Sequence, residues 1–527
     1  MPATPSAEES AAPVTSADQL KKQHVAGVRN FARARLANAD LFGSDLRSAE
    51  LTDADLTGVN LEHADLRDAN FQGATLLRAK LRDANLENAD LSCAVGLLPA
   101  QLAGANLAGA RLPEKFGDFD GLRVVEEESK NARALFFSTL LSCVYGWLTI
   151  ASTSDVLLLT NTSSSPLPII GASIPIVSFY IVGPLILLLL YVYLHLHLQR
   201  LWERLADLPA VFPDGRSLGK CAYPWLLTGL VYSYNPYLKI CRPPLSRLQS
   251  AVSLLIAWWL VPLTVALFWL RYLRRHDWLG TTLHIVVLVA AVGAGVMLYR
   301  LAVSTLRGQR SNPAPLTNLF GQKATYSRAL WVALLAAAIY ILSLGAIEGV
   351  PPEYEVAAGE PSLIQADVTA TDLRRWVPQL LQAFGNKSFA DLREVDVSTR
   401  LPNWKGQEED EIDRVKRGRL RGANLRFADA TRAFLVGADL SRTNLQGSYL
   451  FQANLRGVDF TGANLSGANL KGARLENANL ENSNLNKTNL SATSLTTAKG
   501  LSLKQLATAV TDKSTQLPEN PAAGRNQ

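Results

Sequence analysis

Residues 461–490 read TGANLSGANLKGARLENANLENSNLNKTNL, with a leucine at every fifth position. The column runs from Leu420 to Leu495 over sixteen positions, fourteen of them leucine, with Phe460 and Ala430 as the exceptions. On an α-helix, each step of five residues would rotate the leucines by about 140° and leave no apolar face. On a flat strand, an odd period would place successive leucines on opposite faces. Only a chain that turns a corner every five residues points the whole column inward.

A second run with the same period lies near the N-terminus. From Phe31 to Leu91, thirteen positions five apart hold Leu or Phe, usually with Ala two residues earlier and often with Asp or Asn between. The phase slips by one residue and resumes at Leu97. Four five-residue sides would close one coil of twenty residues, with neighbouring coils about 4.8 Å apart. Asp and Asn suit the corners because they tolerate turn backbone and bond locally.

This A(D/N)LXX motif resembles that of the pentapeptide-repeat family, over about 80 residues at each end. The resemblance implies right-handed quadrilateral β-helices, and sixteen repeats would make four coils. The expected fold class is therefore mixed, with two such β-helices flanking an α-helical transmembrane bundle. The resemblance further implies a bacterial protein of the inner membrane.

The composition divides the chain into seven segments. In order, we expect a disordered tail (1–28), a β-helix (29–112), a linker (113–133), a transmembrane region (134–347), a linker with an amphipathic helix (348–413), a second β-helix (414–497), and a C-terminal cap and tail (498–527) whose short helix begins near residue 503.

The hydrophobic residues, 48% of the chain, are concentrated between the two runs. Five segments approach the ~20 residues that a helix needs to cross a bilayer, and none has a charge near its middle. They are 134–152, 174–198, 251–270, 281–299 and 329–347. Pro184 and Pro262 fall inside spans, where proline is common but can also mark a broken transporter helix.

Lysine and arginine counts in the flanking segments predict the orientation. One set of alternate flanks holds seventeen and the other set three. The N-terminus should therefore be cytoplasmic, and five spans would place the C-terminus on the opposite side. The exceptions are Arg271, Arg274 and Arg275, which would face outward.

An amphipathic helix is expected after the last span, lying on the membrane or on the repeat domain. Its apolar positions are Leu373, Trp376, Val377, Leu380, Leu381 and Phe384. Pro378 would bend this helix or delay its start.

No catalytic, cofactor-binding or metal-binding residues are expected. The four cysteines form no CxxC pair. His195 and His197 would point about 200° apart on a helix, so they could not share a metal, and an interfacial position suits both. His284, one turn inside a span, could be a proton site of a transport system or channel, although a helix-packing hydrogen bond suits it better.

Large apolar residues gather at outward positions in the first coils of the second run, which suggests a contact surface. They are Phe427, Phe434, Val436, Tyr449 and Phe451. The surface could dock on the linker or membrane part of the same chain, or on a separate protein.

Net charge argues against a rod that mimics DNA and protects a topoisomerase, a role of some soluble family members. Such a rod should be strongly acidic, yet residues 29–112 carry −2 and residues 413–497 carry +6. No nucleic-acid partner is expected. The sequence favours a non-enzymatic membrane scaffold whose partners are membrane lipids and an unknown protein, with a transport component as the alternative.

Overall fold

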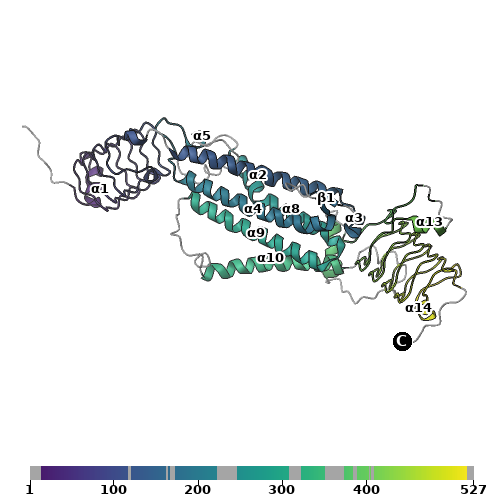
Figure 1. Cartoon of the computed structure of the whole chain (residues 1–527). Coiled ribbons are helices and arrows are strands. Elements are labelled where there is room, and N and C mark those ends of the chain that lie inside the picture. The colour runs from purple at the N-terminus through teal and green to yellow at the C-terminus, as the bar shows by residue number, and fades with distance from the viewer. Residues whose placement is uncertain are drawn as a thin grey trace, which may run out of the picture. The chain divides into compact units, whose positions relative to one another are not determined.

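The computed structural model describes residues 14–116, 120–161, 164–166, 173–221, 246–307, 322–349, 373–383, 388–402, 404 and 409–518. The chain forms two compact units, each with one repeat run and parts of several long helices (Figure 1). The first unit comprises Met1–Leu140, Leu190–Leu260 and Ala294–Leu319. The second comprises Leu141–Leu189, Val261–Gly293 and Phe320–Gln527.

The first repeat run, in the first unit, folds into stacked coils of twenty residues. Arg35 forms a parallel bridge with Asp55, and Asp40 with Asn60, so a bridge recurs every five residues along the run. The pairing consists of isolated bridges rather than continuous strands. The Leu and Phe residues at the centres of the repeats between 31 and 91 are at most 2% exposed. The five-residue period therefore fills a continuous apolar core.

Two positions shape each corner of the coil. The carboxylate of Asp40 accepts a hydrogen bond from the N–H of Phe42 at 3.2 Å, closing a local turn. The residue two after each central leucine takes a left-handed backbone, as at Gly43 (φ 60°) and Asp53 (φ 55°). Glycine, asparagine and aspartate are the residues that adopt this conformation most readily.

Both ends of the first run are covered. Helix α1 (Ala17–Val25) is capped by Ser16 and buries Leu20 against the first coil. The prediction of a disordered tail to residue 28 is therefore wrong from residue 14 onward, because the open coil end provides an apolar surface for this helix. At the other end, the N–H of Leu107 donates to the carbonyl of Val211 at 3.0 Å, and Val211 forms a parallel bridge with Asn106.

Among the described residues, five helices are long and apolar enough to cross a membrane. The five apolar stretches are Gly121–Ser152, Ile176–Ala206, Ser250–Arg275, Trp278–Leu306 and Leu330–Glu348. Four of the stretches belong to single helices: α2 (Asp120–Ser152), α4 (Ile176–Ala206), α9 (Trp278–Leu306) and α10 (Gln322–Glu348). The third stretch is made of four consecutive elements: α7 (Ser246–Leu254), η4 (Leu255–Trp259), α8 (Leu260–Tyr272) and η5 (Leu273–Arg275).

Helix α2 begins at Asp120, so the prediction of a linker over 113–133 is wrong for most of that segment. The charged residues there continue the helix instead of ending it. Lys130 and Glu126, one turn apart, form an ion pair at 2.8 Å, which supports an exposed helical turn. Charged turns of this kind extend a helix beyond the apolar length that hydropathy detects.

The π-helical turn η4 stands next to a proline. Pro262 has no N–H, so the carbonyl of Trp258, four residues earlier, lacks its usual α-helical donor. Within the first unit, the hydroxyl of Tyr191 donates to this carbonyl at 3.1 Å. A side chain from α4 thus satisfies the group that proline leaves unpaired, as membrane helices require.

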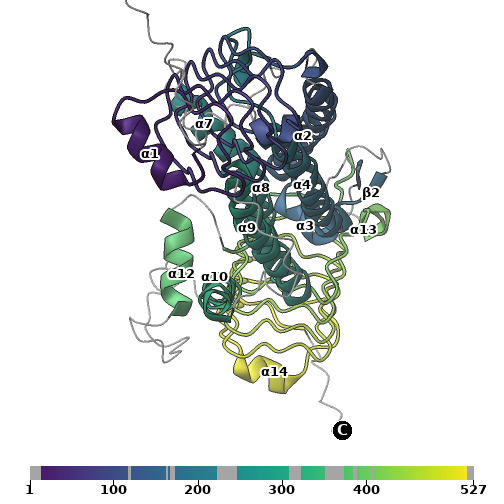
Figure 2. The ribbon, with the colours of Figure 1, turned by 90° about the vertical axis from the view of Figure 1, so that its left-hand side faces the viewer.

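Helix α12 (Leu373–Ala383) packs against α10 (Figure 2). Val377 is fully buried and lies so close to Gly345 that a Cβ at that glycine would stand 2.5 Å from it. The expected amphipathic helix is present with Pro378 inside it, and its buried Val377 meets α10. Phe384 lies outside the described residues.

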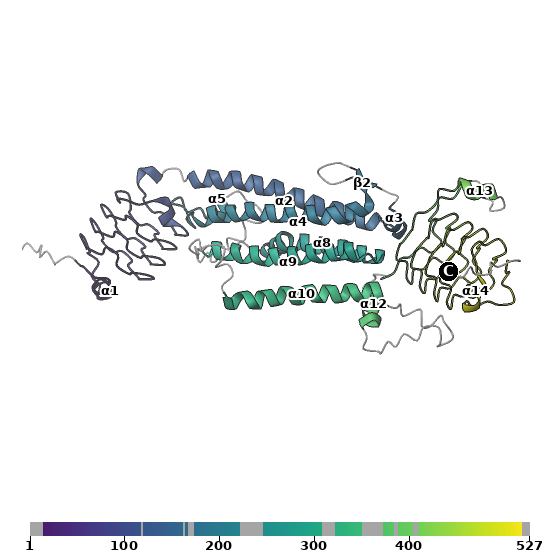
Figure 3. The same ribbon diagram turned by 60° about the horizontal axis from the view of Figure 1, so that its bottom comes forward.

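The second repeat run, in the second unit, repeats the coil geometry from Arg419 onward. A further half coil precedes it, because Asp391 bridges to Asp429 and Asp396 to Phe434. These pairs are 38 residues apart instead of 20, so eighteen extra residues leave the stack and return. The returning part includes α13 (Glu409–Arg414), and α14 (Leu503–Thr508) covers the last coil (Figure 3).

The remaining described elements are short. They are η1 (Pro99–Leu102), η2 (Glu114–Phe116), α3 (Asp155–Thr160), the antiparallel strands β1 (Ser164–Pro166) and β2 (Ser173–Pro175), and α5 (Leu218–Cys221).

Candidate functional site

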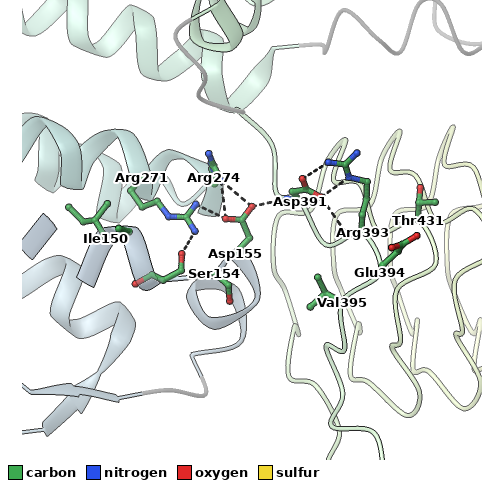
Figure 4. Close-up of a pocket in the computed structure, with 12 residues that line it drawn as sticks. Ile150, Ser154, Asp155, Arg271, Arg274, Asp391, Arg393, Glu394, Val395 and Thr431 are labelled. Carbon is green, nitrogen blue, oxygen red and sulfur yellow. Dashed lines mark hydrogen bonds and ion pairs between the residues drawn. The ribbon is translucent and has the colours of Figure 1, made fainter. Parts of the chain in front are cut away.

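In the second unit, helix ends meet the first half coil of the repeat run around a cavity of about 790 Å³ (Figure 4). Three segments form its walls: the turn after α2, the end of α8 with η5, and the coil around residues 391–395. The lining residues are Ile150, Ala151, Thr153, Ser154, Asp155, Arg271, Arg274, Asp391, Arg393, Glu394, Val395 and Thr431.

Asp155 is the buried charge at this junction, with 6% of its surface exposed. The chain turns sharply there because Ser154 caps α3 by accepting from the N–H of Leu157. One carboxylate oxygen accepts from Arg271 at 2.5 Å, and Arg274 donates to both oxygens, at 3.2 and 3.4 Å. The other oxygen also accepts from the backbone N–H of Asp391 at 2.7 Å. Asp155 therefore joins the ends of two helices to the repeat run.

Three more contacts strengthen this junction. Arg275 donates to the carbonyl of Leu158 at 2.6 Å, and Arg426 donates to the carbonyl of Glu348, the last residue of α10, at 3.0 Å. Leu159 of α3 is part of the apolar core of the second run. The helix ends therefore close this edge of the stack.

His276 lies between the end of η5 and the segment that begins the second repeat run. Its Nε2–H donates to the carbonyl of Ser388 at 3.0 Å, and its ring meets Phe389 edge-on at 5.6 Å. Nδ1 has no partner in the part of the chain that the structure describes. Burial lowers the pKa of His276 to about 4, because the charged form would lose its hydration. The side chain is therefore neutral at pH 7.

The three arginines that disagree with the charge pattern of the other loops all have partners. Arg271 and Arg274 bond to Asp155, and Arg275 bonds to a carbonyl of α3. Their position therefore serves the fold of this junction.

The expected contact surface on the second run is largely covered by the chain itself. Phe427, Phe434 and Val436 are at most 3% exposed, because residues of the segment expected to be a linker cover them, in line with the first of the two docking alternatives. Leu401, Trp404, Ile412 and Val415, from the eighteen-residue excursion, pack with Phe434 and Val436. Phe389 covers Phe427 at a ring distance of 5.6 Å. Tyr449 and Phe451 are half-buried.

The histidines of the spans are packed among other side chains. His284 donates from Nδ1 to the carbonyl of Gly280 at 2.7 Å and stacks on Tyr272. His195 is 1% exposed and lies beside Trp258.

Comparison with known proteins agrees with the coils. A family model for pentapeptide repeats matches in eight copies, over residues 30–68, 60–94, 419–457 and 459–496. The chain belongs to the pentapeptide-repeat family. No curated protein matches this pentapeptide-repeat chain.

Several solved structures are similar to this pentapeptide-repeat protein. A pentapeptide repeat protein from Nostoc PCC 7120 is 35% identical, over 20% of this chain and 76% of that one, with a TM-score of 0.12. Rfr23 from the cyanobacterium Cyanothece 51142 is 29% identical, over 24% and 84%, with a TM-score of 0.18. One from the thylakoid lumen of Arabidopsis thaliana is 30% identical, over 19% and 65%, with a TM-score of 0.13. At these TM-scores the likeness says nothing about the whole chain.

The sequence contains a repeat signal at the junction. Ala390-Asp391-Leu392 and Val395-Asp396-Val397 are two repeats of this pentapeptide-repeat protein, five residues apart. They lie in the segment expected to be a linker (348–413), which is therefore wrong for residues 390–397. Two repeats followed by an excursion do not establish a period, so the sequence pattern passed unnoticed.

Proposed function

We propose that this protein is a non-catalytic, multi-pass scaffold of the bacterial inner membrane that presents one β-helix on each side of the bilayer. The carrying observation is that, within each unit, the repeat run is bonded to the helices rather than connected by a linker alone. Surfaces attached in this way are held in place at the membrane, which suits a platform for another protein.

In the first unit, the attachment is a continuation of the coil. The segment after α4 pairs with the last repeats, through Gly104 N–H to Leu208 O at 2.8 Å and Gly109 N–H to Pro213 O at 3.0 Å. In the second unit, Asp155 and Leu159 provide the attachment. Chain segments from the helical region thus replace a cap at each membrane-side coil end.

We infer that both runs are right-handed quadrilateral β-helices. The twenty-residue spacing of parallel bridges and the inward leucines support the four-sided coil. The right-handed sense follows the resemblance to the family.

The orientation rests on the odd number of spans and on charge. With five spans, the residues before α2 and those after α10 face opposite sides of the membrane. The excess of seventeen basic residues over three in the alternate flanks favours a cytoplasmic N-terminus.

The proposal is tested by labelling single cysteines in intact cells with a thiol reagent that does not cross the inner membrane. Ser514 is exposed in the second unit, so Ser514→Cys in a chain without native cysteines should be labelled. The matched control keeps only Cys93, which is exposed in the first run and should be labelled only after lysis. Protection of both positions in intact cells would place both repeat runs on one side and overturn the topology.

A further inference from the structure

The cavity beside Asp155 begins where two spans end. Ile150 and Ala151 belong to the last turn of the apolar stretch Gly121–Ser152, and Arg271 and Arg274 close the stretch Ser250–Arg275. The opposite wall is the repeat coil. If the helices cross the bilayer, as the proposed function requires, the cavity lies at the depth of the lipid headgroups.

The lining is charged but neutral in sum. It contains three arginines, at positions 271, 274 and 393, and three acids, at positions 155, 391 and 394. The side chain of Asp155 is only 4% exposed, and its oxygens are already bonded within the junction, so it is not available to a ligand. The charges nearer to solvent are Arg393 and Glu394, whose side chains are 51% and 68% exposed.

Arg393 and Glu394 present opposite charges on adjacent residues. Arg393 bonds to Asp391 at 2.8 Å and lies 3.4 Å from Asp429. Glu394 pairs with Arg432 at 3.2 Å. Such exposed pairs contribute little stability, so their partners can be exchanged for a ligand at small cost. Thr431 adds a hydroxyl to the same wall.

We propose that this cavity binds the phosphoethanolamine headgroup of a membrane phospholipid. Arg393, the lining arginine nearest to solvent, receives the phosphate, whose oxygens suit guanidinium donors. Glu394 accepts hydrogen bonds from the ammonium group, and Ile150 and Ala151 border the acyl chains. A zwitterion suits a lining without net charge, whereas a headgroup that is only anionic would add an unpaired charge beside Asp391 and Glu394. The volume is within the usual range for small-ligand sites.

The test measures lipid retention by the full chain in detergent, using native mass spectrometry. Phosphatidylethanolamine, phosphatidylcholine and phosphatidylglycerol with the same acyl chains are added in equal amounts. Phosphatidylethanolamine should be retained best. Glu394→Gln should reduce its retention about tenfold, to the level of phosphatidylcholine, as expected for one lost charge-assisted hydrogen bond. Arg393→Gln should weaken retention of all three lipids.

Arg442→Gln is the matched control, because Arg442 is exposed on the same repeat run and does not line the cavity. Equal retention of the three lipids, or the same lipid profile in Glu394→Gln and Arg442→Gln, would overturn the proposal. Thermal unfolding of each variant shows whether weaker lipid retention results from unfolding of the protein.

Competition with glycerophosphoethanolamine and with inorganic phosphate distinguishes the source of the phosphate. Displacement of the lipid only at a large excess of glycerophosphoethanolamine supports a lipid site, and displacement by inorganic phosphate at equal concentration overturns it. The cysteine labelling tests the topology and does not depend on the outcome of the lipid experiment. If Ser514→Cys is protected while phosphatidylethanolamine is retained selectively, the topology fails and the lipid site stands.

Discussion

At the scale of single residues, this protein repeatedly satisfies a buried polar group with a side chain from another segment. Asp155 collects donors from Arg271, Arg274 and the backbone of Asp391. The carbonyl of Trp258, which Pro262 leaves without its usual α-helical donor, receives the hydroxyl of Tyr191. Removing one member of such a set leaves the others buried and unpaired, which costs more than the bond itself contributes.

Asp155→Asn should destabilise the second unit by about 3–5 kcal/mol, because two arginines would lose the carboxylate that neutralises them. The measurement is thermal unfolding in detergent, followed by tryptophan fluorescence. Asp396→Asn is the control, since Asp396 is a more exposed acid of the same half coil, paired with Arg400. Similar losses of stability in the two variants would show that the burial of Asp155 does not increase its contribution.

Tyr191→Phe should lower the free energy of unfolding by about 1–3 kcal/mol, because the Trp258 carbonyl would then be buried without a donor. Tyr193→Phe, two residues along the same helix but half exposed, should change it by less than about 0.5 kcal/mol. An unchanged Tyr191→Phe variant would mean that water or the π-helical backbone satisfies the carbonyl.

His276 should make stability depend on pH. Its folded pKa of about 4 lies below the ordinary histidine value of 6.5, so the unfolded chain binds the proton more readily. Its contribution is fully present above pH 6.5 and falls as the pH drops toward 4, by at most about 3 kcal/mol. The unfolding of His276→Gln, measured between pH 7 and pH 4.5, should show a smaller decline. Parallel curves for the two proteins would contradict this assignment.

At the scale of elements, the ends of the coils are the decisive features, since an open coil exposes unpaired backbone. Both runs use a glutamine near the end of the stack. Gln101 donates to the carbonyls of Leu76 and Ala79, and Gln505 to those of Leu480 and Ser483. The two glutamines stand in η1 and α14, so one capping device occurs in both runs.

Gln505→Leu should destabilise the last coils by about 2–3 kcal/mol, because two carbonyls and the N–H of Ser502 would lose their partner. Hydrogen exchange of residues 480–500 should speed up locally. Gln446→Leu, on the side of the stack, is the control and should leave exchange there unchanged. Faster hydrogen exchange across the whole run, compared with the unsubstituted protein, would indicate a loss of the whole stack instead.

The repeat runs could be predicted from sequence because their leucines face one interior and obey one period. Helix ends could not, since charged turns such as Glu126–Lys130 continue α2 without any apolar signal. The junction was missed for a different reason. Asp155, Arg271 and Asp391 are distant in sequence, and each alone resembles an ordinary surface charge. For the contact surface, the sequence left two docking alternatives open, because the residues that cover it come from an excursion whose fold has no period.

At the scale of the whole molecule, membrane helices and repeats depend on each other within each unit. Leu159 is part of the core of the second run, and Val211 extends the pairing of the first. A repeat run separated from its helices would expose a coil edge, and the helices would lose part of their support.

A chain that ends after Ala383 tests this dependence, because it lacks the second run and leaves Asp155 without the N–H of Asp391. It should still insert into membranes, but its helical region should unfold at a lower temperature and α3 should become sensitive to protease. A chain that ends after Pro518 is the control and should unfold like the full chain. Equal unfolding of both truncations would show that the helices do not need the repeat.

The excursion between Asp396 and Arg419 has a consequence for how such proteins change over time. Eighteen residues leave the coil, and the pairing of Asp396 with Phe434 shows that the stack resumes in register. The coil therefore accommodates an excursion of eighteen residues at one corner without losing its register. A corner of a pentapeptide stack is thus a site for grafting, where a lineage or an engineer can add a new module while the scaffold keeps its shape.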